Sequence, residues 1–574
     1  MTTSESRRPT LYGSKQAVSS GHYLASAAAQ SILDGGGNAI DAGVAAGLAL
    51  GVLHSHEVNF AGVAPIMIRP ADGKTVSIAG LGPWPASIPA DLFVRDGGAT
   101  AMSGILRTVV PAAPDAWITA LRDHGTMSFA EVAGESIRFA REGFAMFDYF
   151  EFDVRKHRDN YLRWPSNREI YLPRPGDQPA ETGDRFVQEH LAATIQFMAD
   201  AEAAASGSRA EGLEAARAAF YEGDIAADIV RTQREHGGYL THDDLAAYRS
   251  PYERVLSVRW RDFEVFTCDA WCQGPVLAQF LRMLELHGID GLGRQDVAYA
   301  HLLLEVMKAG FADREYRYGD PRFVDVGMEE LLADDHSRLR LSQIDPHRAR
   351  AGMYPPVGAQ EGILDVVPAP AEGRPPLEKA PDTSYVCVID RWGNAFSATP
   401  SDGAHAVPVV PGRGIAVSQR GTQSRIDPRH PSGIAPGKRP RLTPNPAMAT
   451  RDDGSVLTFG CPGGDMQAQA MLQVFLNMFH FGMDVQDAID APRFSTWSFP
   501  NTFAPHEFLS DRVAIEDRFA PSFADGLREL GHDVDLWPAY TRNAAAVELI
   551  YLDAATGFYR AGADPRQPAY AIAS

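Results

Sequence analysis

A short segment around residue 383 constrains this chain more than any other part of its sequence. Residues 352–382 are rich in proline, glycine and alanine, show no hydrophobic period, and run directly into an apolar segment that begins at Thr383. The sequence therefore predicts a mobile loop followed by a buried strand. If the Asp382-Thr383 bond were cleaved, Thr383 would gain a free α-amine beside its hydroxyl, and this amine can act as the base that activates the hydroxyl. A plain surface linker and an ordinary strand start explain the same residues, so the segment alone leaves both interpretations open.

Spaced motifs along the chain follow the order seen in one enzyme family. Thr383-Ser384-Tyr385 is followed by a strand-and-turn motif, a basic motif and a motif with two adjacent glycines, and related motifs precede it from the N-terminal region onward. The other motifs are Ser19-Ser20-Gly21-His22, Gly36-Gly37-Asn38-Ala39, Phe220-Tyr221-Glu222-Gly223, Gly237-Gly238-Tyr239-Leu240, Asp390-Arg391-Trp392-Gly393-Asn394, Gly437-Lys438-Arg439-Pro440, Gly460-Cys461-Pro462-Gly463-Gly464 and Gly562-Ala563-Asp564-Pro565-Arg566. In this order they resemble the γ-glutamyltransferase family, which belongs to the N-terminal nucleophile hydrolases. The resemblance covers nearly the whole chain.

The resemblance implies both a fold and a way of maturing. The fold is expected to be α/β (α+β), a four-layer αββα sandwich of the N-terminal nucleophile hydrolase type. Residues 1–382 would form the large subunit, with its processing loop at 352–382, and residues 383–574 would form the small subunit that starts at the nucleophile. The two segments would be partners in a heterodimer made from one proenzyme by self-cleavage at Asp382-Thr383.

Composition and charge narrow the classes of function. The chain has 574 residues, of which 45% are hydrophobic and 22% charged, a balance typical of a globular protein. Its formal charge of -20 disfavours a nucleic-acid partner or an anionic membrane surface. The N-terminus lacks the apolar run of a secretory signal and no segment reaches membrane-spanning length, so a cytoplasmic protein is expected. The cysteines are scattered and are predicted to be reduced and buried; they are Cys268, Cys272, Cys387 and Cys461.

Periodicity and turn residues predict the main elements. Asn38 follows a glycine cluster and can cap an alanine-rich helix, which suits a helical hairpin and not a phosphate-binding loop. Helices are expected at residues 24–33, 39–50, 193–219 and 297–312. Short strands of a central sheet are expected at residues 384–389, 395–399 and 414–418.

The resemblance also implies roles for individual residues. Thr383 would attack the carbonyl of an amide, and an acyl-enzyme ester would form and then react further. Gly463 and Gly464 match the glycine pair whose backbone amides stabilise the oxyanion, although a simple turn before a helix is the alternative. Ser401 matches a hydroxyl residue that supports the nucleophile, although its Thr-Pro-Ser-Asp-Gly context would also form a plain turn. This chemistry requires no metal and no cofactor.

The residues that hold a γ-glutamyl group in the family are mostly replaced in this chain. Leu81 stands at the position of an arginine, Gly403 at that of an asparagine and Gln423 at that of an aspartate. Leu442 replaces a serine, and only Thr443 keeps a hydroxyl. Because a desolvated carboxylate loses much of its binding free energy without a bidentate arginine, glutathione is disfavoured as the substrate.

A basic stretch in the same region predicts an anionic substrate instead. Residues 420–441 contain six basic residues and one acidic residue, a net charge of +5 in a chain of -20. A positive potential at a cleft attracts anions, which favours a small amide with a carboxylate on its acyl side, such as an oxamate-like or dicarboxylic monoamide. The alternative is that Lys438 and Arg439 are structural ion-pair partners of the acidic surface. The candidate substrate-binding residues are Arg420, Gln423, Arg425, Arg441 and Thr443.

Other interpretations stay open at this point. A true γ-glutamyltransferase or glutathione hydrolase is one, and an unprocessed binding protein on the same fold is another. His54, His56 and Glu57 are close in sequence, but no second motif completes a metal site. The retained nucleophile and glycine pair favour an amide hydrolase or acyltransferase whose partners are a small-molecule amide and its own two segments.

Overall fold

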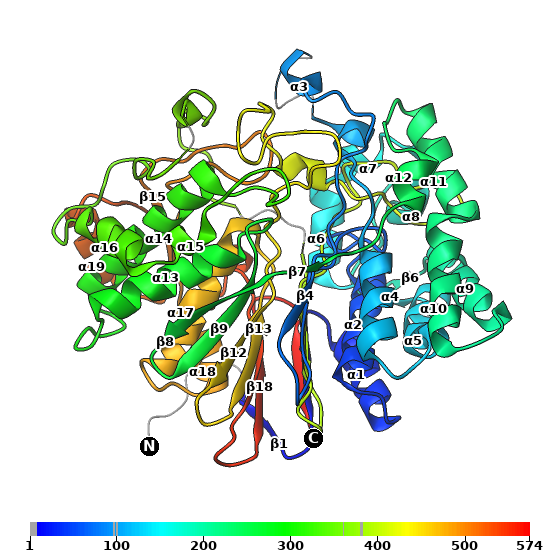
Figure 1. Ribbon diagram of the computed structural model, residues 1–574, viewed down its shortest axis with the longest axis horizontal. Coiled ribbons are helices and arrows are strands. Elements are labelled where there is room, and N and C mark those ends of the chain that lie inside the picture. The colour runs from blue at the N-terminus through cyan, green and yellow to red at the C-terminus, as the bar shows by residue number, and fades with distance from the viewer. Residues whose placement is uncertain (1–7, 96–97, 99–101, 360, 379–382) are drawn as a thin grey trace.

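Two seven-stranded antiparallel sheets lie face to face, and helices cover the outer face of each (Figure 1). The computed structural model describes residues 8–95, 98, 102–359, 361–378 and 383–574. The first sheet has the order β1 (Leu11–Gly13), β18 (Tyr559–Ala563), β17 (Glu548–Leu552), β13 (Val456–Gly460), β12 (Ala447–Arg451), β9 (Phe263–Cys268) and β8 (Val255–Trp260). The second has the order β19 (Tyr570–Ala573), β2 (Ala17–Ser20), β10 (Val386–Ile389), β11 (Ala395–Ala398), β3 (Ile66–Arg69), β4 (Val76–Ile78) and β7 (Tyr252–Glu253). The predicted αββα sandwich is confirmed.

The helices fall into two layers on either side of the sheets (Figure 1). Beside the second sheet lie α1 (Tyr23–Asp34), α2 (Ala39–Leu53), α4 (Ala113–His124), α5 (Phe129–Glu142), α9 (Glu189–Ala204), α10 (Arg209–Tyr221) and α11 (Asp224–Glu235). Beside the first lie α13 (Gly274–His287), α14 (Val297–Arg317), α16 (Asp334–Ser342), α17 (Gln467–Phe479), α18 (Val485–Asp490) and α19 (Pro521–Glu529). Shorter helices are α3 (Leu92–Arg95), α6 (Asp148–Lys156), α7 (Arg158–Tyr161), α8 (Pro165–Tyr171), α12 (His242–Ala246) and α15 (Met328–Leu331). Two small sheets contain β14 (Phe494–Thr496), β15 (Arg512–Glu516) and β16 (Asp533–Trp537), and β5 (Phe144–Ala145) and β6 (Arg185–Phe186).

The strand that follows Thr383 is buried on both faces. In β10, Val388 belongs to the apolar core shared with α2, whereas Cys387 and Ile389 belong to the core between the two sheets. Successive side chains of a strand point to opposite faces, so a strand covered on both sides reads as a continuous apolar run. β10 pairs with β2 on one edge and with β11 on the other, which places it inside the second sheet.

The first two predicted helices are confirmed. They correspond to α1 and α2, and the side chain of Asn38 accepts hydrogen bonds from the N–H groups of Ile40 and Asp41. The carboxylate of Asp41 in turn accepts from Asn38 N at 2.9 Å, which completes a capping box. The reciprocal hydrogen bonds of Asn38 and Asp41 therefore define the start of this helix.

Two element predictions are wrong because turns interrupt the pattern. The single helix expected at 193–219 is two helices, α9 and α10, and the second starts where Ser208 caps the N–H of Glu211. The strand expected at 414–418 forms only an isolated bridge between Val409 and Ala416. The predicted helix at 297–312 is confirmed as α14 and extends further, to Arg317.

The described part of the processing loop, residues 352–359 and 361–378, contains one 3-10 turn, η3 (Ile363–Asp365), and no α-helix or strand. Ile363 and Leu377 are buried against the core of the first sheet. The four cysteines are free and buried, as predicted. Within the described residues, no helix has the length and apolar character needed to cross a bilayer.

Candidate active site

A β-hairpin brings Thr383 opposite Ser401. Extending the β10–β11 register by three residues pairs these two positions. Ser384 N donates a hydrogen bond to the Pro400 carbonyl at 3.0 Å, which keeps the main chains together at this end. Thr383 Oγ1 lies 2.7 Å from Ser401 Oγ, and both residues are fully buried. The structure thus joins the two predicted hydroxyls, whereas Asp382, on the other side of the predicted cleavage site, lies outside the described residues.

Arg420 contacts this pair. It begins the 3-10 helix η4 (Arg420–Gln423), is fully buried, and donates a hydrogen bond from Nη2 to Ser401 Oγ. A guanidinium has donors and no acceptor, so Ser401 Oγ accepts here and still has its own proton to donate. Arg420 Nε lies 3.7 Å from Asp402 Oδ2. The structure therefore places one predicted substrate-binding residue beside the predicted nucleophile.

Gly463 and Gly464 form the turn between β13 and the helical segment that leads into α17. Their φ angles are +123° and +56°, which residues with a Cβ rarely adopt. β13 faces β10 across the sandwich: a Cβ added at Gly460 would lie 2.3 Å from the ring of Tyr385. The end of β13 that leads to the glycines therefore packs on the end of β10 that follows Thr383.

Gln423 and Thr443 bind each other. Gln423 Nε2 donates to Thr443 Oγ1 at 2.8 Å, and Thr443 N donates to Gln423 Oε1 at 3.2 Å. Gln273, which the sequence analysis did not identify, donates from Nε2 to the carbonyls of Thr443 and Gly464 at 2.9 and 2.8 Å. This amide links the loop before β12 to the glycine turn. No motif marks Gln273, because its partners, two backbone carbonyls and the Arg314 guanidinium, are distant in sequence.

Leu81 and Leu442 are the two leucines that the sequence analysis expects at positions of polar anchors. Both are buried in the apolar core between the sheets. A carboxylate placed against them would lose its hydration without gaining a hydrogen-bond partner. These two side chains therefore offer no polar group to a substrate.

Arg425 and Arg441 are paired with one buried carboxylate. Glu315 Oε2 accepts from Arg425 Nη2 at 2.6 Å and from Arg441 Nη2 at 3.0 Å. Burial alone would raise the pKa of Glu315, but the two guanidinium groups outweigh burial and hold that pKa well below its usual range. The structure thus uses these two predicted substrate residues to fasten the basic stretch to α14.

Much of the positive charge of residues 420–441 is offset from outside that stretch. Arg439 pairs with Asp320 at 2.9 Å and with Glu253 at 2.7 Å. Together with Glu315, these acids balance charges that the sequence alone counts as available to a substrate. The local net charge of the stretch is therefore a poor measure of the potential at the nucleophile. Arg420, which itself lies 3.7 Å from Asp402, is the basic residue of this stretch that contacts the nucleophile pair.

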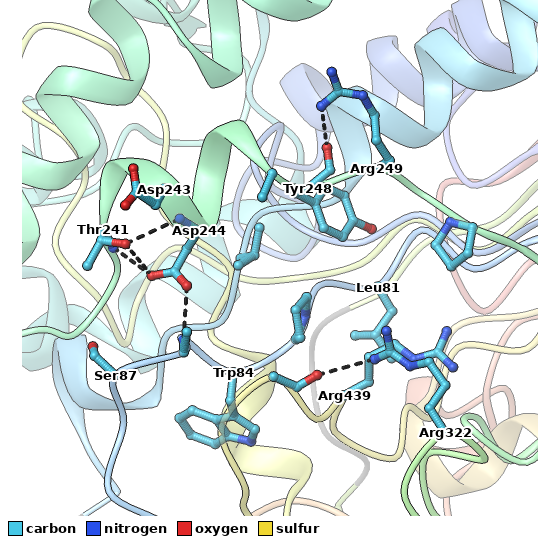
Figure 2. A pocket seen from close by; sticks show the side chains of 16 residues that line it. Leu81, Trp84, Ser87, Thr241, Asp243, Asp244, Tyr248, Arg249, Arg322 and Arg439 are labelled. Carbon is cyan, nitrogen blue, oxygen red and sulfur yellow. Dashed lines mark hydrogen bonds between the residues drawn. The ribbon is translucent and has the colours of Figure 1, made fainter.

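A cavity of about 560 Å³ has Leu81, Trp84 and Tyr248 among its lining residues (Figure 2). Arg322 and Arg439 lie on one side of it, and Asp243 and Asp244 lie across from them. Trp84, a further wall residue, donates from Nε1 to Ser424 Oγ at 2.9 Å. Among the described residues, the lining includes Leu81 but neither the nucleophile pair nor the glycine turn.

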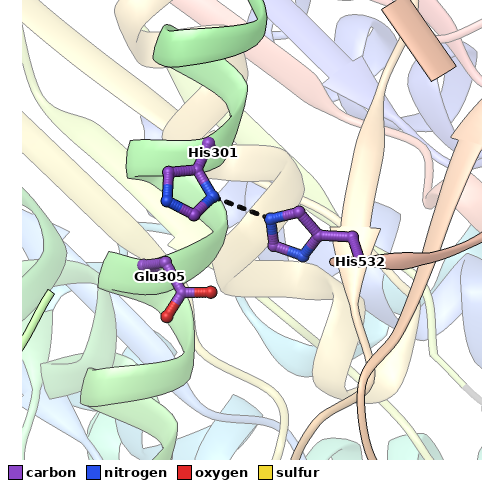
Figure 3. A group of neighbouring side chains, drawn as sticks. All are labelled: His301, Glu305 and His532. Carbon is purple, nitrogen blue, oxygen red and sulfur yellow. Dashed lines mark hydrogen bonds between the residues drawn. The ribbon is translucent and has the colours of Figure 1, made fainter. Parts of the chain in front are cut away.

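One group of described side chains has the composition of a metal site (Figure 3). His301 Nδ1 lies 2.8 Å from His532 Nε2, with Glu305 beside them. Glu305 already accepts hydrogen bonds from Lys308 Nζ at 2.8 Å and from the Tyr354 hydroxyl at 2.6 Å. A divalent cation would face the Lys308 ammonium there, so we interpret this cluster as a structural network.

The histidine motif noted in the sequence is built into the protein interior. The His56 ring stacks on Phe150 with ring centroids 4.0 Å apart, and Glu57 accepts a hydrogen bond from the Tyr149 hydroxyl. Glu57 also presents its backbone carbonyl to Asp402 N at 3.0 Å. These residues therefore support the turn that contains Ser401.

Comparison with known proteins gives matches over almost the full length. The family profile described as Gamma-glutamyltranspeptidase matches residues 25–574. The glutathione hydrolase-like YwrD proenzyme of Bacillus subtilis (strain 168) is 30% identical over 572 residues, 98% of this chain and 99% of that protein. The oxamate amidohydrolase proenzyme of Klebsiella pneumoniae subsp. pneumoniae is 27% identical over 523 residues, 90% of each chain. The crystal structure of cephalosporin acylase from Bacillus halodurans superposes with a TM-score of 0.83 and 26% identity, covering 100% of this chain and 99% of that one.

Proposed function

The chain belongs to the gamma-glutamyltranspeptidase family, and on that basis we propose that it is an autoprocessed amide hydrolase or acyltransferase with Thr383 as nucleophile. The proposed cut falls between Asp382 and Thr383 and separates residues 1–382 from residues 383–574. Two of the relatives described above are named proenzymes, which supports maturation by cleavage. The observation that carries the proposal is the buried contact between Thr383 Oγ1 and Ser401 Oγ at the start of a central strand.

Each step of the proposed reaction uses a group that this chain supplies. Thr383 Oγ1 attacks the amide carbonyl carbon while its proton passes to the α-amine that cleavage has freed. The backbone N–H groups of Gly463 and Gly464 stabilise the oxyanion. The C–N bond then breaks, the leaving amine takes the proton, and an ester joins the acyl group to Thr383. Water or an amine acceptor attacks this ester, and Oγ1 leaves with a proton.

The substrate we propose is a small amide with a carboxylate on its acyl side. Arg420 supports this choice, because it is a buried cation in contact with the nucleophile pair. The apolar surroundings of Leu81 and Leu442 support the loss of the usual γ-glutamyl anchors. The relative from Klebsiella pneumoniae is named for activity on oxamate, a substrate of this class.

Replacing Arg420 with glutamine tests the substrate class. Glutamine keeps a hydrogen-bond donor and removes the charge, so the preference for oxamate over its neutral analogue oxamide should fall by about 10- to 100-fold. The measurement is kcat/KM for ammonia release from each substrate with purified, processed enzyme.

Arg429→Gln is the matched control, since Arg429 lies in the same basic stretch but is exposed and pairs with Asp427. Its preference should equal that of the wild type. A wild type that hydrolyses γ-glutamyl amides and ignores oxamate would contradict the proposed substrate class and leave the nucleophile assignment standing.

Substituting Gly463 with alanine tests the oxyanion role. The new Cβ would lie 3.0 Å from the Ala545 Cβ at a φ of +123°, a tight contact in a conformation that strains a residue with a side chain. We therefore expect the backbone N–H groups of the turn to change position. We expect kcat to fall by about 100-fold. Gly454→Ala is the control, because Gly454 also has a positive φ, +92°, but a Cβ there meets only the Ala554 Cβ, at 3.9 Å. Equal losses of kcat in both variants would point to folding and not to the oxyanion.

A further inference from the structure

A carboxylate stands behind Arg420. Asp402 directly follows Ser401 and is fully buried. It accepts a hydrogen bond from Ser418 Oγ at 2.5 Å and another from Gln419 N at 3.2 Å, and its Oδ2 lies 3.7 Å from Arg420 Nε. A single side chain therefore contacts three consecutive residues, the last of which, Arg420, begins η4.

The backbone of Asp402 is strained. Its φ is +120°, a value that costs free energy in a residue with a side chain and persists only where the surroundings impose it. The main chain does so here, because Asp402 N donates to the Glu57 carbonyl at 3.0 Å and Asp402 bridges Val58. Owing to this turn, two adjacent residues contact one guanidinium at different nitrogens: Ser401 at Nη2 and Asp402 at Nε.

Asp402 also interacts electrostatically with Arg420 and Arg107. Burial raises the pKa of Asp402, and the positive charges of Arg420 and Arg107 oppose that rise. Burial and the charge of Arg163 lower the pKa of Arg107 to about 10. Asp402 thus lies against the buried guanidinium of Arg420 and within electrostatic reach of Arg107.

We propose that Asp402 is a positioning residue for the nucleophile. It holds Arg420 so that Nη2 donates to Ser401 Oγ, and Ser401 then directs its own proton to Thr383 Oγ1. The direction of both hydrogen bonds follows from the arginine: its guanidinium can only donate, so Ser401 Oγ accepts from Arg420 and donates to Thr383. This inference rests on the proposed function, because it takes Thr383 as the nucleophile.

The chain of donors has a use in the second half of the reaction. When the acyl ester is resolved, the bond between Thr383 Oγ1 and the acyl carbon breaks and the electron pair returns to Oγ1. A hydroxyl donor 2.7 Å away stabilises the oxygen as it gains charge. If Ser401 no longer donated its proton toward Thr383 Oγ1, kcat should therefore fall more than KM rises.

A double-mutant cycle tests the coupling between Asp402 and Arg420. Asn is nearly isosteric with Asp and tolerates a positive φ, so Asp402→Asn removes the charge and little else. We expect kcat for oxamate to fall by about 30-fold with KM changed by less than about 3-fold, and the same substitution in an Arg420→Gln background to cost less than about 3-fold. Ser418→Ala, which removes one contact to Asp402 and keeps its charge, should cause a smaller loss that also disappears in that background.

Asp427→Asn is the control, since Asp427 pairs with exposed Arg429 in the loop that follows η4. It should leave kcat unchanged, and thermal unfolding of every variant separates a positioning effect from loss of the fold. Losses that multiply in the double variant, or an unchanged kcat in Asp402→Asn, would overturn the assignment of Asp402 alone. A wild type that neither cleaves itself nor releases ammonia would overturn the proposed function and this inference with it.

Discussion

Thr383→Ala is expected to purify as one uncut chain of 574 residues with at least about 10⁴-fold lower amide hydrolysis than the wild type. The same oxygen performs both reactions in the proposed mechanism, so its removal abolishes both. The mutation deletes one hydroxyl and one methyl group from a buried position whose hydroxyl contacts Ser401. Intact mass and a denaturing gel report cleavage, and ammonia release reports turnover.

Thr383→Ser is the informative companion to this variant. Serine keeps the hydroxyl and the α-amine, so it should still cleave itself and still turn over, more slowly, because the methyl group that restricts the threonine rotamer is gone. An alanine variant that is cut at the same bond as the wild type would show that another group or another protease makes the cut. That result would remove Thr383 as the self-processing nucleophile.

Glu315→Gln should lower the free energy of unfolding by about 3–5 kcal/mol and abolish activity. Its carboxylate faces two buried guanidinium groups, Arg425 and Arg441, and an amide leaves both charges without their counterion. The basic stretch that these residues fasten begins with Arg420, so the nucleophile pair should lose its donor. Chemical denaturation at neutral pH measures the stability, and the activity assay is run below the denaturation midpoint.

The control is Glu330→Gln, which breaks the 3.0 Å pair with Arg317 at the end of the same helix, where the Glu330 side chain is 56% exposed. It should cost less than about 1 kcal/mol. Acid gives a second check. Because the folded pKa of Glu315 lies below the unfolded value of about 4.3, its contribution is fully present above that pH and is lost only as the pH falls through the folded pKa. A difference between wild type and variant that fades at weakly acidic pH would contradict the pairing.

Local signals predicted individual helices and strands around the site, whereas the family resemblance implied the sandwich and the role of Ser401. Asn38 and its partner Asp41 mark a helix start within four residues of sequence, and an unbroken apolar run marks a strand buried on both sides. The contact between Thr383 and Ser401 follows from the register of one short hairpin. These features depend on neighbours in sequence, so one sequence contains the information.

The charges around the site could not be predicted in the same way. Arg425 and Arg441 read as free cations because Glu315 lies more than 100 residues away in sequence, on α14. Asp402 looked like a turn residue, since its partners Ser418 and Arg420 reach it only after the chain has folded back. A local charge count ignores such partners. The charge near the nucleophile depends on which basic side chains the folded chain pairs with buried acids.

Each of the two large sheets contains strands from both sides of the proposed cleavage site at residue 382, which limits what cleavage could change. β2, from before the cut, lies between β19 and β10, from after it, and in the other sheet β12 pairs with β9 from before the cut. Pulling the two pieces apart would break hydrogen-bond ladders in both sheets, so dissociation and unfolding would be the same event. On dilution, the cleaved protein would then stay assembled as the uncut chain does. Dissociation of the two segments could not be measured separately from unfolding. Cleavage in such a topology would have to follow folding. Once cleaved and denatured, the two segments could refold only by associating as separate chains, so refolding would depend on protein concentration.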